Sequence, residues 1–328
     1  MVIHLVLVLS IALTSIAVSA AEIDSFTSRN VALPDAASAI NAVFNDRIAE
    51  GVANANMISQ NNNERTCDKE VLYTELRKAI FQSWTASWGL KGYALDTQLQ
   101  EQLTQYSYQL SLNDSVYRDL NYLEAFSLNL KELSDVVRIN HHLVGIDKLG
   151  HFFAEGWHYF EMTTQDQESL SAAMSWGRDQ ERGKFGYITT GIFSFADLTA
   201  NFNGWRFWNR VLKKEPDPVK GTFANWVTRP YISCAVQWRD SITRQQFIYA
   251  WTYNQNFDIR DYVDGAWDEA QNCNSYADPV IENKVMTRID NLGGPLQCPL
   301  TPSLCQQAKD KYGHFSKWLL HPQCLTSD

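Results

Sequence analysis

The sequence predicts a helix-dominated, all-α protein with a helical bundle core and an irregular, disulfide-bonded C-terminal section. Apolar residues recur at three- and four-residue steps through much of the 328-residue chain, whereas the alternation typical of half-buried strands is scarce. Five of the six cysteines lie beyond residue 219, in a stretch rich in Trp, Tyr and Asn. Helix packing is therefore expected to build the core, and cross-links to hold the C-terminal part.

The first 20 residues have the features of a signal peptide for export. The run from Val2 to Val18 is almost wholly apolar, and Val18-Ser19-Ala20 places small residues before Ala21. We expect cleavage at this point, a periplasmic or secreted location, and no membrane-spanning segment in the mature chain. The alternative is a retained anchor, because the run is close to the minimum of about 17 residues for a spanning helix.

Three sections follow the signal peptide and are expected to pack as one globule. Residues 21–139 form a helical scaffold, residues 140–215 carry a polar site, and residues 216–328 are rich in aromatic residues and cysteine. The second boundary falls at Pro216 and Pro218, which cannot continue a helix. Helices are predicted near 34–57, 68–87, 94–111, 115–139, 145–162, 193–212, 241–251, 259–272, 279–291 and 303–313, with a few strands near 224–238.

The cysteines predict disulfides, because their number is even and the chain enters an oxidising compartment. Three bridges allow fifteen pairings, of which Cys298 with Cys305 is the most local, and that pairing would send Cys67 to a partner in the C-terminal third. A zinc site is disfavoured because the sequence contains no C-x-x-C motif. The six cysteines are Cys67, Cys234, Cys273, Cys298, Cys305 and Cys324.

The charge of the chain limits its partners. The formal net charge is −9 and the sequence has no stripe of Lys and Arg, which argues against nucleic acid and anionic membrane surfaces and leaves a cell-envelope component as the expected partner. The acidic run from Asp258 to Glu269 is expected to form a solvated helix face. The 11 Trp, 14 Tyr and 16 Phe residues are assigned mainly to the core, with sugar stacking on exposed rings as the alternative.

The helix predicted near 145–162 carries ionisable residues on one face. Asp147, His151 and Glu155 are spaced four apart, and Lys148 lies beside them. A carboxylate next to an imidazole can orient it for acid–base chemistry, or both can bind a metal ion. The alternative is a core histidine with its hydrogen bonds satisfied, preceded by Asp147 as a helix cap.

The helix predicted near 193–212 repeats this spacing, with Asp197 and Asn201 four apart among aromatic residues. A buried polar group without a partner costs several kcal/mol by transfer estimates, so these side chains need partners. The polar face of the first helix supplies them, and we expect Asp147, His151, Asp197 and Asn201 to form one site. Glycines at 150, 156 and 204 would allow the two helices to approach closely.

Together the two helices contain a spaced motif, which reads Asp147-Lys148-x-x-His151-Phe152 and, about 45 residues later, Asp197-x-x-x-Asn201-x-x-Gly204. The motif resembles the core signature of the VanZ-like family and of a related family of periplasmic lipoproteins, over about 60 of the 328 residues. The resemblance implies a shared polar site, with Glu181 as the counterpart of an acidic residue between the two halves. VanZ-like proteins carry the motif on membrane-spanning helices and are associated with glycopeptide resistance through an undefined activity at the cell envelope. The helices here are short and interrupted by charge, so membrane spanning is not expected.

Three interpretations of this exported protein follow. The favoured one is a structural hydrogen-bond network that locks the two helices together. The second is an envelope hydrolase or transferase in which Asp147 and His151 form an acid–base pair, and a third is a glycan- or lipid-binding module on the aromatic surface. Whether the protein is an enzyme is left open, and so is a divalent metal as cofactor. The candidate catalytic residues are Asp147, Lys148, His151, Glu181, Asp197 and Asn201.

Overall fold

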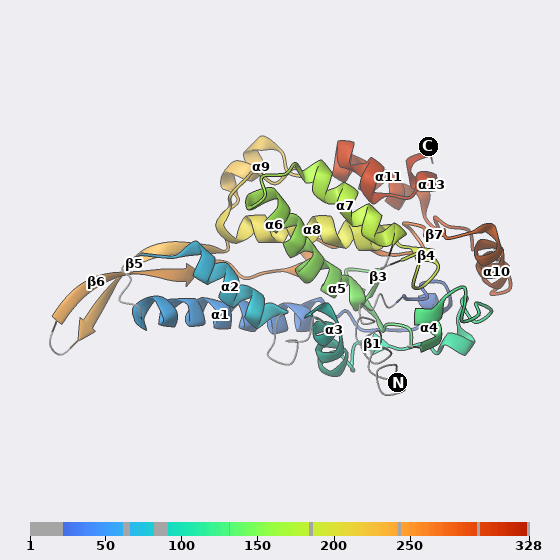
Figure 1. The fold of residues 1–328 in the computed structure, drawn as a ribbon, viewed down its shortest axis with the longest axis horizontal. Coiled ribbons are helices and arrows are strands. Elements are labelled where there is room, and N and C mark those ends of the chain that lie inside the picture. The colour runs from blue at the N-terminus through green and yellow to red at the C-terminus, as the bar shows by residue number, and fades with distance from the viewer. Residues whose placement is uncertain are drawn as a thin grey trace, which may run out of the picture.

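Helices dominate the computed structural model, as the sequence predicts, and the strands form only small sheets (Figure 1). The structure describes residues 22–61, 66–81, 91–130, 132–183, 186–241, 244–293 and 296–326. The predicted signal peptide and the last part of the helix predicted at 68–87 lie outside these residues. The longer α-helices are α1 (Ala37–Asn61), α2 (Lys69–Ile80), α3 (Lys91–Gln102), α6 (Gly156–Thr164), α7 (Leu170–Arg182), α8 (Phe195–Leu212), α10 (Pro279–Asp290) and α11 (Pro302–Tyr312). The shorter ones are α4 (Phe126–Leu130), α5 (Asp147–Gly150), α9 (Thr222–Val227), α12 (Ser316–Leu319) and α13 (Pro322–Thr326).

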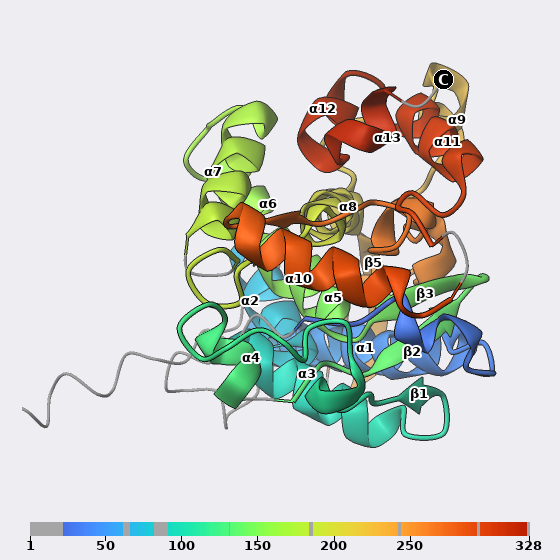
Figure 2. The same ribbon diagram turned by 90° about the vertical axis from the view of Figure 1, so that its right-hand side faces the viewer.

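Helix α8 lies at the centre of the molecule. Every residue from Phe195 to Asn209 is buried, which is typical of a helix that neighbours cover on all sides. Figure 2 looks along α8 and shows α7 beside it, α11 to α13 above it and α1 below it. Within the described residues, no helix combines the length and the apolar character that crossing a bilayer requires.

A second helical rod crosses α8. It consists of α5, a π-helical turn over His151–Glu155 and α6, which follow one another without a break. A π-helical turn inside an α-helix is rare and is often found at functional sites. The sequence predicts this rod near 145–162, but it gives no sign of the π-helical turn.

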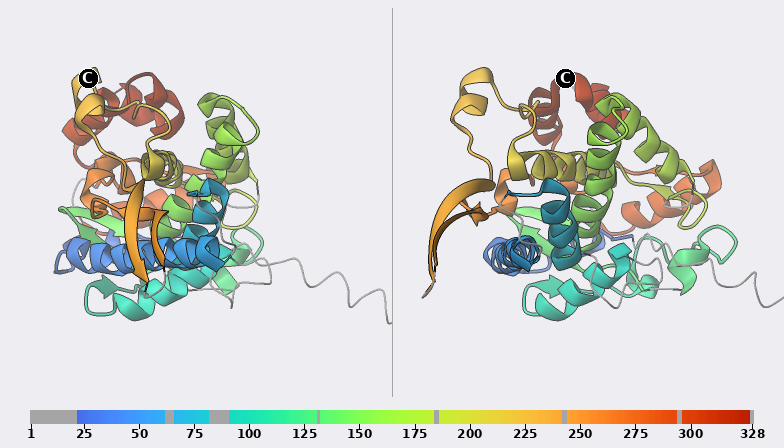
Figure 3. Two further views of the ribbon diagram at one scale, coloured as in Figure 1. Left: turned by 90° about the vertical axis from the view of Figure 1, so that its left-hand side faces the viewer. Right: turned by 60° about the vertical axis from the view of Figure 1, so that its left-hand side comes forward.

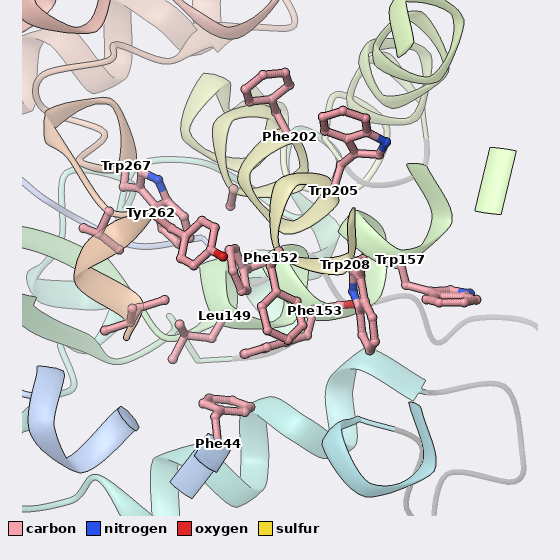
Figure 4. Close-up of a cluster of buried hydrophobic side chains, with 14 of the residues drawn as sticks. Phe44, Leu149, Phe152, Phe153, Trp157, Phe202, Trp205, Trp208, Tyr262 and Trp267 are labelled. Carbon is pink, nitrogen blue, oxygen red and sulfur yellow. The ribbon is translucent and has the colours of Figure 1, made fainter. Parts of the chain in front are cut away.

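Aromatic side chains pack the crossing of the two helices into the core (Figure 4). The rings of Trp157 and Trp208 meet edge to face with centroids 5.0 Å apart, and Trp208 Nε1 donates a hydrogen bond to the carbonyl oxygen of Phe153 at 2.9 Å. From the other side, Phe44 of α1 stacks on Phe153 at 4.0 Å. The same cluster of buried apolar residues includes Tyr262, so all three sections of the chain contribute to it.

Two glycines allow the close crossing, as the sequence predicts for positions 156 and 204. A Cβ atom on Gly204 would lie 1.8 Å from the carbonyl oxygen of Phe152, and one on Gly156 would lie 2.5 Å from Gly204 Cα. Both distances are far below van der Waals contact, and the atoms that would be hit belong to the backbone. The crossing therefore requires glycine at both positions.

We predict that Gly204→Ala lowers the free energy of unfolding by about 2–3 kcal/mol, because helix α8 must move away from Phe152 to make room for the methyl group. Gly221→Ala is the matched control, since a Cβ atom at that glycine meets nothing within 4 Å and its φ is −65°. Urea denaturation of both variants provides the measurement. A Gly204→Ala protein as stable as the control would contradict this account of the crossing.

The strands form three small sheets. They are β1 (Ser107–Tyr108), β2 (Val136–Ile139), β3 (His142–Gly145), β4 (Ile192–Phe193), β5 (Ile232–Ser241), β6 (Arg244–Tyr253) and β7 (Ser275–Tyr276). Strands β1, β2 and β3 pair in that order, β4 pairs with β7, and β5 pairs with β6 in a hairpin that projects from the body of the molecule (Figures 1 and 3). The β4–β7 pair holds the start of α8 beside the segment that precedes β7.

The helix predicted at 115–139 is wrong. Of the residues that the structure describes there, only those of α4 and strand β2 are regular, and the predicted helix at 94–111 ends at Gln102 with strand β1 following. The side chain of Asn121 accepts backbone hydrogen bonds from Leu123 and Glu124, which favours a turn over a helix. Leu123, an apolar residue within the range of the predicted helix, is 95% exposed.

The helices predicted at 241–251 and 259–272 are also wrong. The first region is strand β6, whose aromatic and β-branched residues favour a sheet. The second contains two 3₁₀ turns, Ile259–Asp261 and Gly265–Trp267, each capped by the aspartate before it. The acidic run is therefore not a solvated helix face, and its last residue, Glu269, is buried. Of the strands expected near 224–238, the structure has β5, preceded by α9.

All six cysteines form disulfides, but the pairing of Cys298 with Cys305 is wrong. The bridges join Cys67 to Cys234, Cys273 to Cys298, and Cys305 to Cys324. Cys305 lies on α11, which brings it to α13 and Cys324 rather than to its neighbour in the sequence. The bridge from Cys67 reaches the C-terminal third, as expected, and ties the start of α2 to β5.

Candidate functional site

The candidate site is centred on Lys148, whose side chain is fully buried. Its Nζ atom lies 2.7 Å from Asp147 Oδ2, 2.6 Å from Asp197 Oδ1 and 2.6 Å from Glu269 Oε1. Burial by itself would lower the pKa of Lys148, but the three carboxylates outweigh it and raise that pKa well above its usual value. One permanent positive charge is thus shared by carboxyl groups from three parts of the chain.

The carboxylate of Asp197 joins Lys148 to His151. Its Oδ1 atom binds the ammonium group, and its Oδ2 atom lies 3.1 Å from His151 Nε2. The imidazole is 12% exposed, whereas the Asp197 side chain is 4% exposed and that of Lys148 is fully buried, so His151 is where this group of side chains meets solvent. Burial would lower the pKa of His151, but the charge and the hydrogen bond of Asp197 raise it to about 10.

The side-chain amide of Asn201 faces the other ring nitrogen, Nδ1, at 3.1 Å. The same end of the amide lies 3.1 Å from the backbone carbonyl oxygen of Asp197 and 3.3 Å from that of His151. An NH₂ group there donates to both carbonyls, whereas an oxygen there accepts only from a protonated Nδ1. The NH₂ orientation also donates to an unprotonated Nδ1, so it leaves a proton on Nδ1 without an acceptor, whereas the oxygen orientation accepts that proton.

Local structure around α8 fixes these groups. Ser194 caps α8: its Oγ accepts the backbone N–H of Asp197 at 3.2 Å and lies 3.0 Å from Asp197 Oδ1. Glu269 approaches from the segment before β7, where Asn274 Nδ2 donates to its Oε2 at 2.9 Å. The nearby bridge of Cys273 further constrains this segment.

Two more buried carboxyl groups adjoin the site. Glu181, in the last turn of α7, and Glu22 are each 2% exposed, and Thr190 Oγ1 donates to Glu22 Oε1 at 2.7 Å. Burial raises the pKa of Glu181 well above its usual value, and the charge of Asp197 adds to the increase. The pKa of Glu22 rises in the same way, through burial and the charges of Glu269 and Asp197.

The surroundings of the carboxyl groups shift their pKa values in opposite directions. Burial would raise the pKa of Asp197, but His151 and Lys148 together hold it below its usual value, so Asp197 is ionised. Burial raises the pKa of Glu269 to about 7 against the opposing effect of Lys148, and it also raises that of Asp147. Groups with opposed pKa shifts in one place are typical of acid–base sites.

Asp147, His151 and Asp197 each offer an atom that lies within 4.8 Å of the atoms offered by the other two, a spacing that a divalent metal ion can bridge. The Oδ1 atom of Asp147 is buried without a hydrogen-bond partner among the described residues, so it is the oxygen such an ion would take. The ammonium of Lys148, however, already contacts both carboxylates. The donor set suits a metal, but the local charge favours the lysine as the resident cation.

The site residues that the sequence predicts lie close together, but the pairs in contact differ from the expected ones. Asp147 contacts Lys148 and Asp197 contacts His151, because the ammonium between the helices draws the Asp147 carboxylate to itself. Glu269 was missed as a site residue: it lies 75 residues beyond Ser194 in an acidic run, and only its position four residues before Cys273 distinguishes it. Nothing in the sequence indicates that Glu22, near the predicted cleavage point, lies at the site.

The chain was compared with protein-family models, with curated proteins and with solved structures. No family model, curated protein or solved structure matches it. The resemblance to VanZ-like proteins therefore stays a prediction from the motif, and the function must be argued from the geometry of the site.

Proposed function

We propose that this protein is an exported enzyme of the cell envelope, a hydrolase or group transferase in which His151 is the general acid. The observation that carries the proposal is the arrangement around the imidazole. Asp197 accepts the hydrogen bond of Nε2–H, while the end of the Asn201 amide at Nδ1 also faces two backbone carbonyl oxygens, a position that suits an NH₂ group better than an oxygen that could accept from Nδ1–H. The proton on Nδ1 is thus the one that the protein holds least firmly.

The proposed chemistry uses this proton. Nδ1–H of the imidazolium donates its proton to the leaving oxygen of a bound substrate as the bond to that oxygen breaks. Water, or an acceptor hydroxyl group in a transfer, forms the new bond to the atom that the oxygen leaves and returns its own proton to Nδ1. Asp197 keeps the ring oriented and stabilises its positive charge, the role an aspartate has in a catalytic triad. Lys148 acts as a positioning residue, because it holds the other Asp197 oxygen and keeps that carboxylate ionised.

The position of His151 supports an active rather than a purely structural role. It begins the π-helical turn and is the residue of the central group that reaches solvent. Burying five carboxyl groups beside one lysine costs stability, and such a cost is more readily explained by chemistry than by packing. The five are Glu22, Asp147, Glu181, Asp197 and Glu269.

A structural network is the second candidate function, and one observation favours it. Lys148 contacts carboxylates from α5, from α8 and from the segment before β7, so it fastens three parts of the fold together. In this interpretation His151 and Asn201 only complete the hydrogen bonding of the two helices.

Complementation separates the two candidates. In a strain that lacks this gene, envelope glycans and lipids are compared by mass spectrometry after the return of wild type, His151→Gln or His158→Gln. His158 is the control, because it lies on α6 with 41% of its side chain exposed. We predict that His151→Gln is folded, as checked by thermal unfolding, and loses at least 100-fold in activity, in keeping with general acid catalysis.

The expected outcome is that wild type and His158→Gln restore the envelope composition and that folded His151→Gln does not. Restoration by His151→Gln would overturn the enzymatic proposal and leave the structural network. Folded Asp197→Asn is a second test of the same role, because an amide cannot stabilise the imidazolium.

A further inference from the structure

We propose that a positively charged cleft at the C-terminal end of α8 binds an anionic glycan. Two cavities of about 660 and 440 Å³ adjoin there, and Lys213 and Lys214 line both of them. These volumes lie in the range of ligand-binding pockets. The two lysines therefore form a ridge over which an extended ligand could place one part in each cavity.

The positive charge in the cleft comes from separate parts of the chain. Lys69, at the start of α2, lines the larger cavity, and Lys220 lines the smaller one. Among the residues lining the two cavities, Glu215 is the one acidic residue, and Lys220 Nζ also lies 3.9 Å from Asp217 Oδ2. In a protein with a net charge of −9, such a concentration of lysine marks a local attraction for anions.

The dipole of α8 explains only part of this cluster. Cations are stabilised at a helix C-terminus, which accounts for Lys213 and Lys214. It does not account for Lys69, which belongs to another helix, or for Lys220. Burial lowers the pKa of Lys214, and burial together with the charge of Arg210 lowers that of Lys220, so the lysines are partly desolvated where a bound anion would stabilise their charge.

Exposed aromatic rings border the cleft. Trp226 of α9 lines the smaller cavity and is 78% exposed, and Phe223, also exposed, lies beside it with ring centroids 6.1 Å apart. Tyr249 of β6 lines the larger cavity and is half exposed. Large exposed apolar side chains with a polar rim are typical of binding grooves, and flat rings offer a stacking face to a sugar.

The shape of the site favours a glycan over a membrane. The lysines line concave pockets, whereas binding to a lipid surface needs basic and apolar side chains on a face that can lie against the bilayer. The bridge between Cys67 and Cys234 lines the larger cavity and fixes the start of α2 to β5. Carboxylate, phosphate or sulfate groups on a sugar chain would bind the lysines, and sugar rings would stack on the aromatic rim.

The cleft is separate from the polar site. Asp197 and Lys213 lie at opposite ends of α8, roughly 24 Å apart at 1.5 Å per residue. The inference therefore does not rest on the proposed enzymatic role of His151 and stands whichever function the buried site has.

Isothermal titration calorimetry of the full secreted chain tests the proposal. The probes are hexagalacturonate and dextran sulfate oligomers as charged glycans, maltohexaose as a neutral glycan, and vesicles of phosphatidylglycerol with phosphatidylcholine. We expect binding of at least one charged glycan that weakens as salt increases. Lys213→Gln/Lys214→Gln and Trp226→Ala should each weaken it at least tenfold.

The control is Lys309→Gln/Lys317→Gln, which removes two lysines of α11 and α12 that lie outside both cavities. It should bind as wild type does. The proposal is overturned if neither charged glycan binds, if Lys213→Gln/Lys214→Gln binds as tightly as the control, or if only the vesicles bind, which would make the cleft a membrane contact instead.

Discussion

Lys148→Met is expected to lower the free energy of unfolding by about 3–5 kcal/mol at neutral pH. The substitution keeps an unbranched side chain of similar length but removes the cation that Asp147, Asp197 and Glu269 share. The carboxylates remain buried without their partner and carry the full cost of desolvation. This cost is larger than the net stability that the ion pairs contribute. Urea denaturation at pH 7 measures the difference from wild type.

Lys78→Met is the matched control for this prediction. Lys78 Nζ lies 2.6 Å from Glu75 Oε1, the same separation as in the buried pairs, but its side chain is 55% exposed. The Glu75 side chain is 9% exposed, but water reaches the lysine side of this pair and screens it, so this variant should lose only about 0–1 kcal/mol. Equal losses in the two variants would mean that burial does not set the strength of the Lys148 contacts.

The pH dependence of Lys148→Met provides a second measurement. Without the ammonium, the folded-state pKa values of Asp147 and Glu269 rise further above their unfolded values and that of Asp197 rises from below its own, so the folded protein binds protons more tightly. The deficit relative to wild type should therefore shrink as pH falls from about 7 to 4. A deficit that stays constant over this range would indicate lost packing instead of unpaired charge.

The sequence predicted the local part of the candidate site well. Residues four apart on a helix share a face whatever the rest of the fold does, so the pairs Asp147 with His151 and Asp197 with Asn201 could be placed on two helices in advance. Their convergence also followed, because polar groups on apolar helices need partners. The glycines at 156 and 204 indicated how close the helices come.

Contacts set by the tertiary fold could not be predicted in this way. Glu269 reaches Lys148 only because β4 pairs with β7, a two-residue pairing that has no periodic signal. The same holds for Cys305, whose partner depends on how α11 and α13 pack. The leucines near 115–139 have the spacing of a helix, so the apolar pattern predicted one. Such a pattern takes no account of the polar side chain of Asn121, which forms a turn there.

The lysine cleft also shows why a sequence-level charge argument has limits. Lys69 and Lys213 are far apart in the chain, so no basic stripe appears in the sequence, and the net charge of −9 indicates only what the average surface attracts. The bridge of Cys67 to Cys234 helps to bring the two lysines to one cavity. Local electrostatics can therefore oppose the average, and the ligand of the cleft follows from the local charge.

The final prediction concerns stability at alkaline pH. Asp197 raises the pKa of His151 from its unfolded value of 6.5 to about 10, so the folded protein binds the imidazole proton more tightly than the unfolded chain does. The stabilisation is complete below pH 6.5 and is lost as pH rises through about 10. At about 1.4 kcal/mol per pKa unit, the loss is of order 5 kcal/mol.

Urea denaturation of wild type, His151→Gln and His158→Gln between pH 6 and pH 10.5 measures this loss. Other groups that titrate at high pH act in all three proteins, so the difference between the curves isolates His151. His158→Gln should follow wild type, whereas His151→Gln should start less stable and show a flatter curve, because glutamine has no proton to lose. Parallel curves for wild type and His151→Gln would mean that the imidazole is not held charged by Asp197, and the general-acid role proposed for His151 would fail with it.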